Sequence, residues 1–321
     1  MFLNPYDLLT SRNPAQALEK LAVQLYPSKI RVEPNDKATK FLFGMSDENN
    51  DDLLQGATYN IVEKKNLKKV GNIKSPFQLV NSDDCQDINP LDPYDRAVLA
   101  VCVSEMLAGN PCTTPAIIYR GLTGKVNKGS DAKPHPLQRE YILASVRRLM
   151  GKIFSSDISQ LCEYLKYNNG SPMKFHSAIL PACYIEAYVG GKDLTTIFFD
   201  RPSPLYSIAD IKNQVLRYDV SLLDVPDQKN TRMNIELKNY AMCRIQETKL
   251  HKQLKPILTF DDIFKKCGLQ NASLKTKMDA RNTIEEFFKH LKDKKIIKDF
   301  ELTKHGNKFP SITFKISFNN F

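Results

Sequence analysis

The sequence predicts an α+β fold in which three helices followed by two strands occur twice. Three observations support it: each helix set has capping residues and apolar residues at helical spacing, an alternating strand pair follows each set, and 321 residues suffice for about two domains. Hydrophobic residues make up 42% of the chain and charged residues 26%, as in folded globular proteins. We expect a first domain at 58–202, a linking helix at 203–230 and a second domain at 231–321.

The first 57 residues precede this repeated pattern. Asn13 can cap a short helix from Pro14 to Leu25, because proline suits the first helical position and leucines follow at helical spacing. Residues 44–56 (GMSDENNDDLLQG) are acidic and polar with a glycine at each end, which predicts a loop or a partly disordered segment. Residues 1–57 are therefore expected to be an N-terminal helix and an acidic loop outside the two domains.

The first domain combines short strands with a set of three helices. Apolar residues from Tyr94 to Leu107 predict a helix, which the sequence Ala-Gly-Asn-Pro ends. Thr114 can cap a second helix that has Pro115 at its first position. The other predicted elements are short strands within 58–80, a third helix at 137–150, and two strands at 182–189 and 194–199 joined by a Gly-Gly-Lys-Asp turn.

The second domain repeats this order, and its pattern is the clearer of the two. A long helix is predicted at 231–250, and Thr259 and Ser273 can cap a second and a third helix. Two alternating strands, IIKDFEL and SITFKIS, follow. Three helices with a hairpin constitute a winged helix, so the sequence predicts two in tandem. The residues of the last helix expected to face inward are Ala280, Ile284, Phe287, Phe288 and Leu291.

The positive charge of the chain is unevenly distributed. The sequence has 46 Lys and Arg against 36 Asp and Glu, a net of +10, but residues 1–90 carry a net of −1 and residues 91–321 a net of +11. Such a surplus attracts nucleic acid or an anionic membrane, although it can also be an ordinary solvated surface. Much of it falls on 119–152 and 273–298, the regions of the two third helices, with nets of +6 and +4.

A winged helix places its third helix in the major groove of DNA and its hairpin near phosphates. Arg147 and Arg148, predicted on the outer face of their helix, suit guanine, and Asn282 suits adenine. Tyr141 could stack on a base or pack internally. As an alternative to binding DNA, Lys292, Lys294 and Lys295 could be solvated residues whose charge favours the dipole of a helix end. The candidate DNA-binding residues are Lys125, Lys128, Lys133, Gln138, Arg139, Tyr141, Arg147, Arg148, Lys192, Lys275, Lys277, Arg281, Asn282, Lys289 and Lys308.

No catalytic, metal or cofactor site is predicted. The seven cysteines include no Cys-x-x-Cys pair and the five histidines no His-x-His pair, while phosphate-loop and nucleophile-elbow motifs are missing. Cys102 and Cys183 lie in apolar runs and are expected to be buried thiols. No apolar run is long enough to span a membrane and the first residues do not form a signal peptide, so a cytoplasmic protein is expected.

Several stretches resemble the double winged-helix replication initiators of theta-replicating plasmids and related mobile elements. The resemblance covers about residues 58–318 and leaves the first 57 residues unexplained. It implies binding to repeated double-stranded origin sites, origin opening, recruitment of a host replicative helicase or initiator, homodimer formation and no catalytic residues. It lies in LDPYDRAVLAVCVSEM, in residues 142–149 with their paired arginines, in SPLYSIADIKNQVLRYDVSLLD and in RNTIEEFFKHLKDKKIIKDFEL.

Two other classes of function stay open on the sequence. A winged-helix transcriptional regulator or phage-type DNA-binding protein would have the same architecture, with target sites at a promoter rather than an origin. A scaffold that uses winged helices to bind protein would have no salt-sensitive affinity for DNA. An enzyme is unsupported, because no motif points to one.

Overall fold

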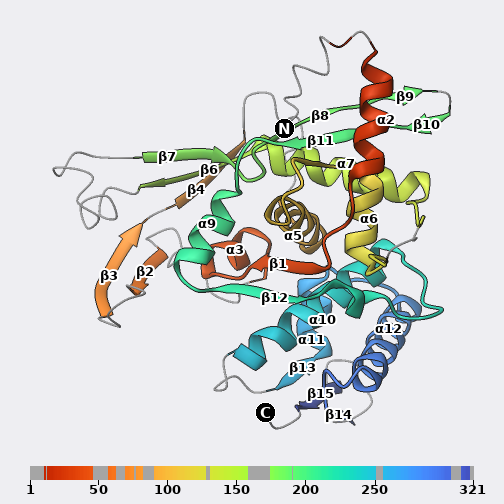
Figure 1. Cartoon of the computed structure of the whole chain (residues 1–321). Helices are drawn as coiled ribbons and strands as arrows, with labels where there is room; N and C mark the ends of the chain where they lie inside the picture. The colour runs from red at the N-terminus through yellow and green to blue at the C-terminus, as the bar shows by residue number, and fades with distance from the viewer. Residues whose placement is uncertain are drawn as a thin grey trace.

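The computed structural model of the protein combines helices with small antiparallel sheets, so the fold is α+β as predicted (Figure 1). The helix α5 (Pro93–Leu107) runs through the centre, and nearly all of its residues are buried. The structure describes residues 11, 13–45, 57–62, 69–75, 77–81, 90–127, 131–157, 174–189, 191–250, 256–304 and 312–318.

The first unit is built on α5 and contains the three predicted helices. A two-residue strand follows α5 and pairs with the last strand of the unit, so that the sheet has the order β5-β11-β8. Between β8 and β11 the chain forms a second hairpin of two short strands, β9 and β10. In its turn Gly191 has a φ of +78°, which glycine adopts without strain. The elements after α5 are β5 (Cys112–Thr113), α6 (Pro115–Thr123), α7 (Pro136–Gly151), β8 (Ala182–Ile185), β9 (Tyr188–Val189), β10 (Lys192–Asp193) and β11 (Thr196–Phe199).

The second unit has the same three helices, short strand and final strand pair as the first, without its additional strands. Its short strand after the first helix again pairs with the last strand, giving the order β13-β15-β14. All five residues expected to face inward on its third helix are buried. The elements are α10 (Arg232–Leu250), β13 (Ile257–Thr259), α11 (Phe260–Lys266), α12 (Leu274–Asp293), β14 (Asp299–Lys304) and β15 (Ile312–Ser317).

The predicted helix starts are confirmed by their capping bonds. The Thr114, Thr259 and Ser273 hydroxyls each accept a hydrogen bond from a backbone N–H in the first turn of the helix that follows. Asp92 and His135 cap α5 and α7 in the same way, ahead of a proline at the helix start.

The strands expected within 58–80 are confirmed, and the partner of one of them was not predicted. β2 (Ala57–Val62) pairs with β3 (Lys69–Ser75), while β4 (Phe77–Asn81) pairs with β6 (Lys152–Asp157). The strand β6 continues directly from α7 and also pairs with β7 (Lys174–Ala178). These two strands are inserted between the third helix and β8, and with β4 they form a three-stranded sheet.

Residues 1–57, expected to be an N-terminal helix and an acidic loop, contain two further elements that the sequence did not predict. The helix α2 (Pro14–Gln24) forms as expected with Asn13 as its cap, but β1 (Ile30–Pro34) and α3 (Lys37–Leu42) follow and pack inside the molecule. The strand β1 pairs with a strand of the segment expected to link the domains. The acidic stretch after Met45 lies outside the described residues.

The linking helix predicted at 203–230 covers only the start of that segment. The helix α9 (Pro204–Ile211) ends early, because Asn213 takes a left-handed conformation with φ 53°. The chain then forms β12 (Val215–Asp219), which pairs with β1, and a short 3-10 helix, η1 (Val220–Leu223).

Three groups of buried apolar side chains hold these elements together. The largest surrounds α5, the second lies among α10, α11 and α12, and the third joins α2 to β11 and the start of α6. Cys102 belongs to the first group as predicted, whereas Cys183 is exposed, because β8 is an edge strand of its sheet.

Candidate nucleic-acid interface

The third helix of the first unit, α7, packs one face against α5 and leaves the other open. Ile142, Val146 and Leu149 are buried, as the helical spacing predicts. Leu137, Glu140 and Arg147 are exposed on the other side. The open side of α7 is therefore the part of this helix that a ligand could reach.

Arg147 occupies the predicted outer face. Its side chain is 44% exposed, its Nε donates a hydrogen bond of 3.3 Å to the Tyr184 hydroxyl, and its Nη2 lies 4.0 Å from Glu186. These contacts hold the guanidinium beside β8 without burying it. The arrangement leaves Arg147 available to a ligand of the first unit.

Arg148 was predicted on the same outer face, and that placement was wrong. Its side chain is 11% exposed, and its Nη2 donates a hydrogen bond of 2.7 Å to the fully buried carboxylate of Asp95 on α5. Ser145 donates to the same carboxylate. The pair neutralises both charges inside the molecule, so Arg148 fastens α7 to α5 and is not on the surface that Arg147 occupies.

Arg139 is another candidate that the structure places inside. It is buried and donates hydrogen bonds to Asp193 at 2.6 Å, to Glu186 at 3.1 Å and to Thr195 at 2.9 Å. Its guanidinium also lies 4.7 Å from the centre of the Tyr188 ring. Burial opposes ionisation of Asp193, but the hydrogen bonds from Arg139 and Thr195 outweigh it and lower the pKa of that carboxyl. Arg139 therefore joins α7 to the β9–β10 hairpin.

Two polar candidates near the start of α7 have structural partners. The Gln138 side chain accepts from the backbone N–H of His135 and donates to the carbonyl of Asn230, so it caps the helix and reaches the segment just before α10. The Tyr141 ring packs against the first core, 5.3 Å from the guanidinium of Arg232. This packing is the internal alternative that the sequence left open for Tyr141.

The lysine candidates of the first unit lie at its surface. Lys133 is exposed in the loop before α7, and Lys125 lies 4.0 Å from Asp224. Lys192, at the hairpin, forms an ion pair of 3.0 Å with Glu19, so α2 lies against the hairpin (Figure 1). Lys128 lies outside the described residues.

The third helix of the second unit, α12, presents a longer polar face. Lys275, Asn282 and Lys289 are exposed at seven-residue intervals, which places them on one side of the helix over about four turns. Glu285 lies between them, 3.0 Å from Lys289 and 3.8 Å from Arg281, so part of the basic charge is balanced within the helix.

The remaining candidates of the second unit differ in how they are held. The Lys277 amine donates to the carbonyl of Gln270 at 2.6 Å and lies 5.5 Å from the centre of the Phe264 ring. It therefore closes the turn before α12, with its side chain half-buried. Lys308, expected in the turn between the last two strands, lies outside the described residues.

Sequence reasoning missed two exposed apolar side chains on α12. Leu274 is 65% exposed and Met278 is 50% exposed, one helical turn apart at the start of the helix. The signal was available, because neither residue belongs to the inward set that begins at Ala280.

The charge counted along the sequence overstates the charge on the surface of the first unit. Of the cations in 119–152, Arg139 and Arg148 are paired with buried or half-buried acids and Lys152 is buried. In the second unit, by contrast, the basic side chains that follow α12 are exposed. They are Lys294, Lys295 and Lys298, joined by Lys292 in the last turn of α12, and they lie close to the helix C-terminus where positive charge is favourable.

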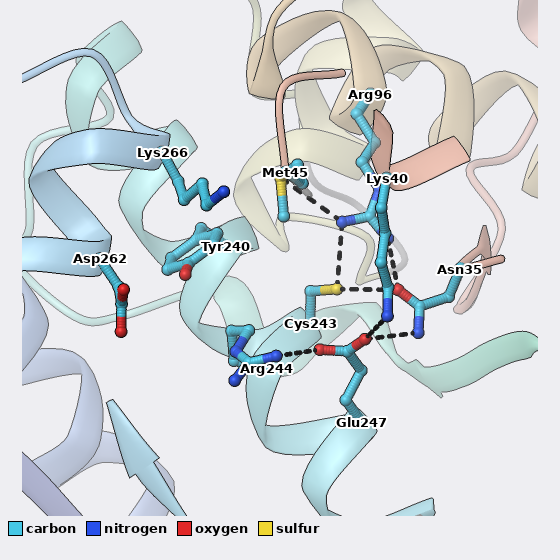
Figure 2. Close-up of a pocket in the computed structure, with 10 residues that line it drawn as sticks. All are labelled: Asn35, Lys40, Met45, Arg96, Tyr240, Cys243, Arg244, Glu247, Asp262 and Lys266. Carbon is cyan, nitrogen blue, oxygen red and sulfur yellow. Dashed lines mark hydrogen bonds and ion pairs between the residues drawn. The ribbon is translucent and has the colours of Figure 1, made fainter. Parts of the chain in front are cut away.

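A buried polar network joins the two units through their first helices. Arg96 on α5 donates hydrogen bonds to the Cys243 thiol on α10 at 3.1 Å and to Asn35 after β1 at 3.0 Å (Figure 2). Glu247 on α10 accepts from Asn35 and forms an ion pair with Lys40 on α3. The segment from β1 to α3 thus lies between the first helices of both units and binds each of them.

The cavity at this junction has little room for a ligand. It holds about 50 Å³ between Arg96, Tyr240 and Glu247 (Figure 2), which is space for a few water molecules and too little for a cofactor-sized ligand. Burial raises the pKa of the Cys243 thiol to about 12, so it is protonated and not a nucleophile. Burial opposes ionisation of Glu247, but Lys40, Asn35 and Arg244 outweigh it and lower its pKa to about 2. The network is a structural joint.

Neither a metal site nor a membrane-spanning helix is present in the part of the chain that the structure describes. No three His, Cys, Asp or Glu side chains gather there as metal ligands would, and no helix there is both long and apolar enough to cross a bilayer.

Comparison with known proteins identifies no family for this chain. No family model matches the sequence, and no curated protein matches it. Two solved structures match over most of their length, both of RctB. The first, of domains 2 and 3, has a TM-score of 0.36 at 14% sequence identity, and the match covers 76% of this chain and 85% of that chain. The second, of RctB domains 2-3, has a TM-score of 0.39 at 10% sequence identity, and the match covers 77% of this chain and 87% of that chain. Such low scores and identities establish no common fold.

Proposed function

We propose that both units are winged helices and that the protein binds double-stranded DNA with sequence specificity. The observation that carries the proposal is the repeated topology: each unit has three helices, a short strand after the first of them, and a final hairpin whose last strand pairs with that short strand. In this arrangement the third helix enters the major groove and the hairpin approaches the phosphates.

The exposed side chains of the third helices support DNA as the ligand. Arg147 on α7 can donate two hydrogen bonds to guanine, and Asn282 on α12 can pair with adenine. Lys133, Lys275 and Lys289 are exposed beside these helices and suit phosphate contacts. The surplus of +11 in residues 91–321 gives the affinity that is independent of sequence.

Within this class we propose a replication initiator that acts without catalysis. Two units on one chain suit repeated sites in an origin, where binding would favour strand opening and the recruitment of a host helicase or initiator. The sequence resemblance described above supports this role, and so does the rigid joint between the units, which would hold two third helices at a fixed spacing.

The test is binding of the purified protein to a labelled duplex from its own flanking DNA and to an unrelated duplex, from ~50 to ~200 mM salt. Affinity driven by phosphates falls steeply over this range for both duplexes, whereas specific binding retains a preference. We expect a preference for the flanking duplex. Equal affinities for the two duplexes, or no binding at ~50 mM salt, would contradict the proposal.

Matched variants locate the binding face. Removing Lys275 and Asn282 together (K275A/N282A), or Arg147 alone (R147A), should weaken specific binding by about tenfold or more, since each good base contact contributes ~1–3 kcal/mol. The control, K294A/K298A, removes two exposed charges from beyond the end of α12 and should cost far less. Equal losses in both sets would mean that the third helices are not the binding face.

The same measurements separate the other classes of function. Specific binding at a promoter, with no effect on replication of a plasmid that carries the flanking DNA, would favour a transcriptional regulator. Absence of DNA binding with retention of a protein partner would favour a scaffold.

A further inference from the structure

We propose that Leu274 and Met278 on α12 contact the methyl groups of thymines, so that the second unit selects A·T base pairs together with Asn282. This inference rests on the proposed function and specifies the bases that one unit recognises. It is carried by the two exposed apolar side chains, for which the fold provides no structural role.

The three side chains form one continuous line on the helix. Leu274 is 65% exposed, Met278 is 50% exposed, and Asn282 is exposed one further turn along. Residues four apart are neighbours on a helix surface. At ~1.5 Å per residue, the line from Leu274 to Asn282 covers about 12 Å, the length of about three to four base pairs.

The core of the second unit is complete without these two residues. The inward side of α12 is filled by Ala280, Ile284, Phe287, Phe288 and Leu291, each fully buried. A single exposed leucine requires no explanation, because folded proteins carry many apolar atoms on their surfaces. Two adjacent exposed apolar side chains at the start of α12 are different, since they form an apolar patch within the proposed contact surface.

The charge around the line favours DNA over an apolar protein partner. Between Leu274 and Asn282 the helix carries three cations, Lys275, Lys277 and Arg281, and one acid, Asp279. Ser273 also caps the helix start, whose backbone N–H groups favour a phosphate. In the major groove thymine presents a methyl group, which suits an apolar side chain. Adenine presents a hydrogen-bond donor and an acceptor, which suit an asparagine. The exposed Asp279 can accept a hydrogen bond from a flanking cytosine.

The experiment removes the methyl groups from the DNA and leaves its base pairing unchanged. The full-length protein is first used to select its tightest duplex from a random-sequence pool. Each thymine of that duplex is then replaced in turn by uracil, which lacks only the methyl group, and affinity is measured by fluorescence anisotropy. Burying one methyl group contributes ~0.8 kcal/mol, so uracil at a contacted position should weaken binding by about fourfold.

Variants assign the effect to the two side chains. L274A and M278A should each bind the thymine duplex more weakly than the native protein and lose the preference for thymine over uracil at one position. N282A should lose discrimination between A·T and G·C at a neighbouring pair. The matched control is L107A, which removes an exposed leucine from the end of α5 and should keep the full thymine preference.

The outcomes separate this inference from the function on which it rests. No DNA selected from the pool would overturn the proposed function itself. Specific binding with equal affinity for thymine and uracil at every position would overturn only the methyl contacts. Specific binding that L274A and M278A leave unchanged would do the same.

Discussion

Arg147 and Arg148 are neighbours on α7 with opposite surroundings. Removing Arg148 (R148A) would leave the buried Asp95 carboxylate without its cation, and breaking a buried pair in this way costs ~3 kcal/mol or more of unfolding free energy. R147A removes an exposed side chain and should change the unfolding free energy by less than ~0.5 kcal/mol. Urea denaturation followed by circular dichroism measures both. Equal stabilities for the two variants would contradict the burial of the Arg148 pair.

Glu236 on α10 should make the stability of the protein fall as pH rises. Its carboxyl accepts a hydrogen bond from Arg232, yet burial outweighs that bond and raises its pKa to about 7. At pH values between the unfolded pKa of 4.5 and the folded pKa of about 7, Glu236 keeps its proton in the folded protein and has lost it in the unfolded chain. The stabilisation present below pH ~4.5 is therefore lost as pH rises towards ~7, by up to about 3 kcal/mol for this group.

The substitution E236Q tests this dependence. Glutamine keeps an acceptor for Arg232 and cannot ionise, so the variant should be the more stable protein at pH ~8 and should lose less stability between pH ~5 and ~8 than the native chain does. Unfolding free energies at the two pH values measure the difference. An identical pH dependence in both proteins would show that Glu236 does not titrate in this range.

Arg139 links two elements, the helix α7 and the β9–β10 hairpin. R139Q should loosen the hairpin locally, because its hydrogen bonds to Asp193 and Glu186 are charge-assisted and contribute ~2 kcal/mol between them. Amide hydrogen exchange in residues 186–195 should accelerate about tenfold or more, while exchange in α12 stays unchanged. Faster exchange throughout the chain would instead assign Arg139 to global stability.

The elements that the sequence predicted correctly are those specified by residues close together in the chain. The caps Thr114 and Ser273 and the apolar spacing of α12 each act within a few positions, so a local pattern reveals them. The pairing of β1 with β12 is different. There the Tyr218 hydroxyl donates a hydrogen bond to Glu33, 185 positions away, and no local pattern encodes such a partner.

In the candidate site, too, the sequence predicted what local spacing determines and missed what distant partners determine. Exposure of Arg147 and Asn282 follows from helical spacing, and the structure agrees with it. Arg139 and Arg148 are arginines on the same helix as Arg147. The carboxylates to which they donate hydrogen bonds lie 54 and 53 positions away in the sequence, on other elements. A cation near a predicted outer face can turn towards such an acid, and only the packed structure reveals it.

At the scale of the whole molecule, the joint between the units determines how two DNA sites can be bound together. Arg96, Asn35 and Glu247 are buried, and each bonds to elements of a different part of the chain. Disturbing such a network leaves buried polar groups unsatisfied, so the units are held in one arrangement rather than connected by a flexible tether. A rigid connection makes the second binding event intramolecular only when the site spacing matches.

The spacing between half-sites should therefore be fixed. Inserting five base pairs between the half-sites of the selected duplex rotates one by about half a turn, and inserting ten restores the rotation but adds ~34 Å. A rigid protein should lose about a hundredfold in affinity with either insertion, because only one unit can then bind. The control duplex carries the same insertion outside the site and should bind normally. Full affinity with five added base pairs would mean that the units move independently, and recovery with ten would mean that they can separate along the DNA while keeping the same face.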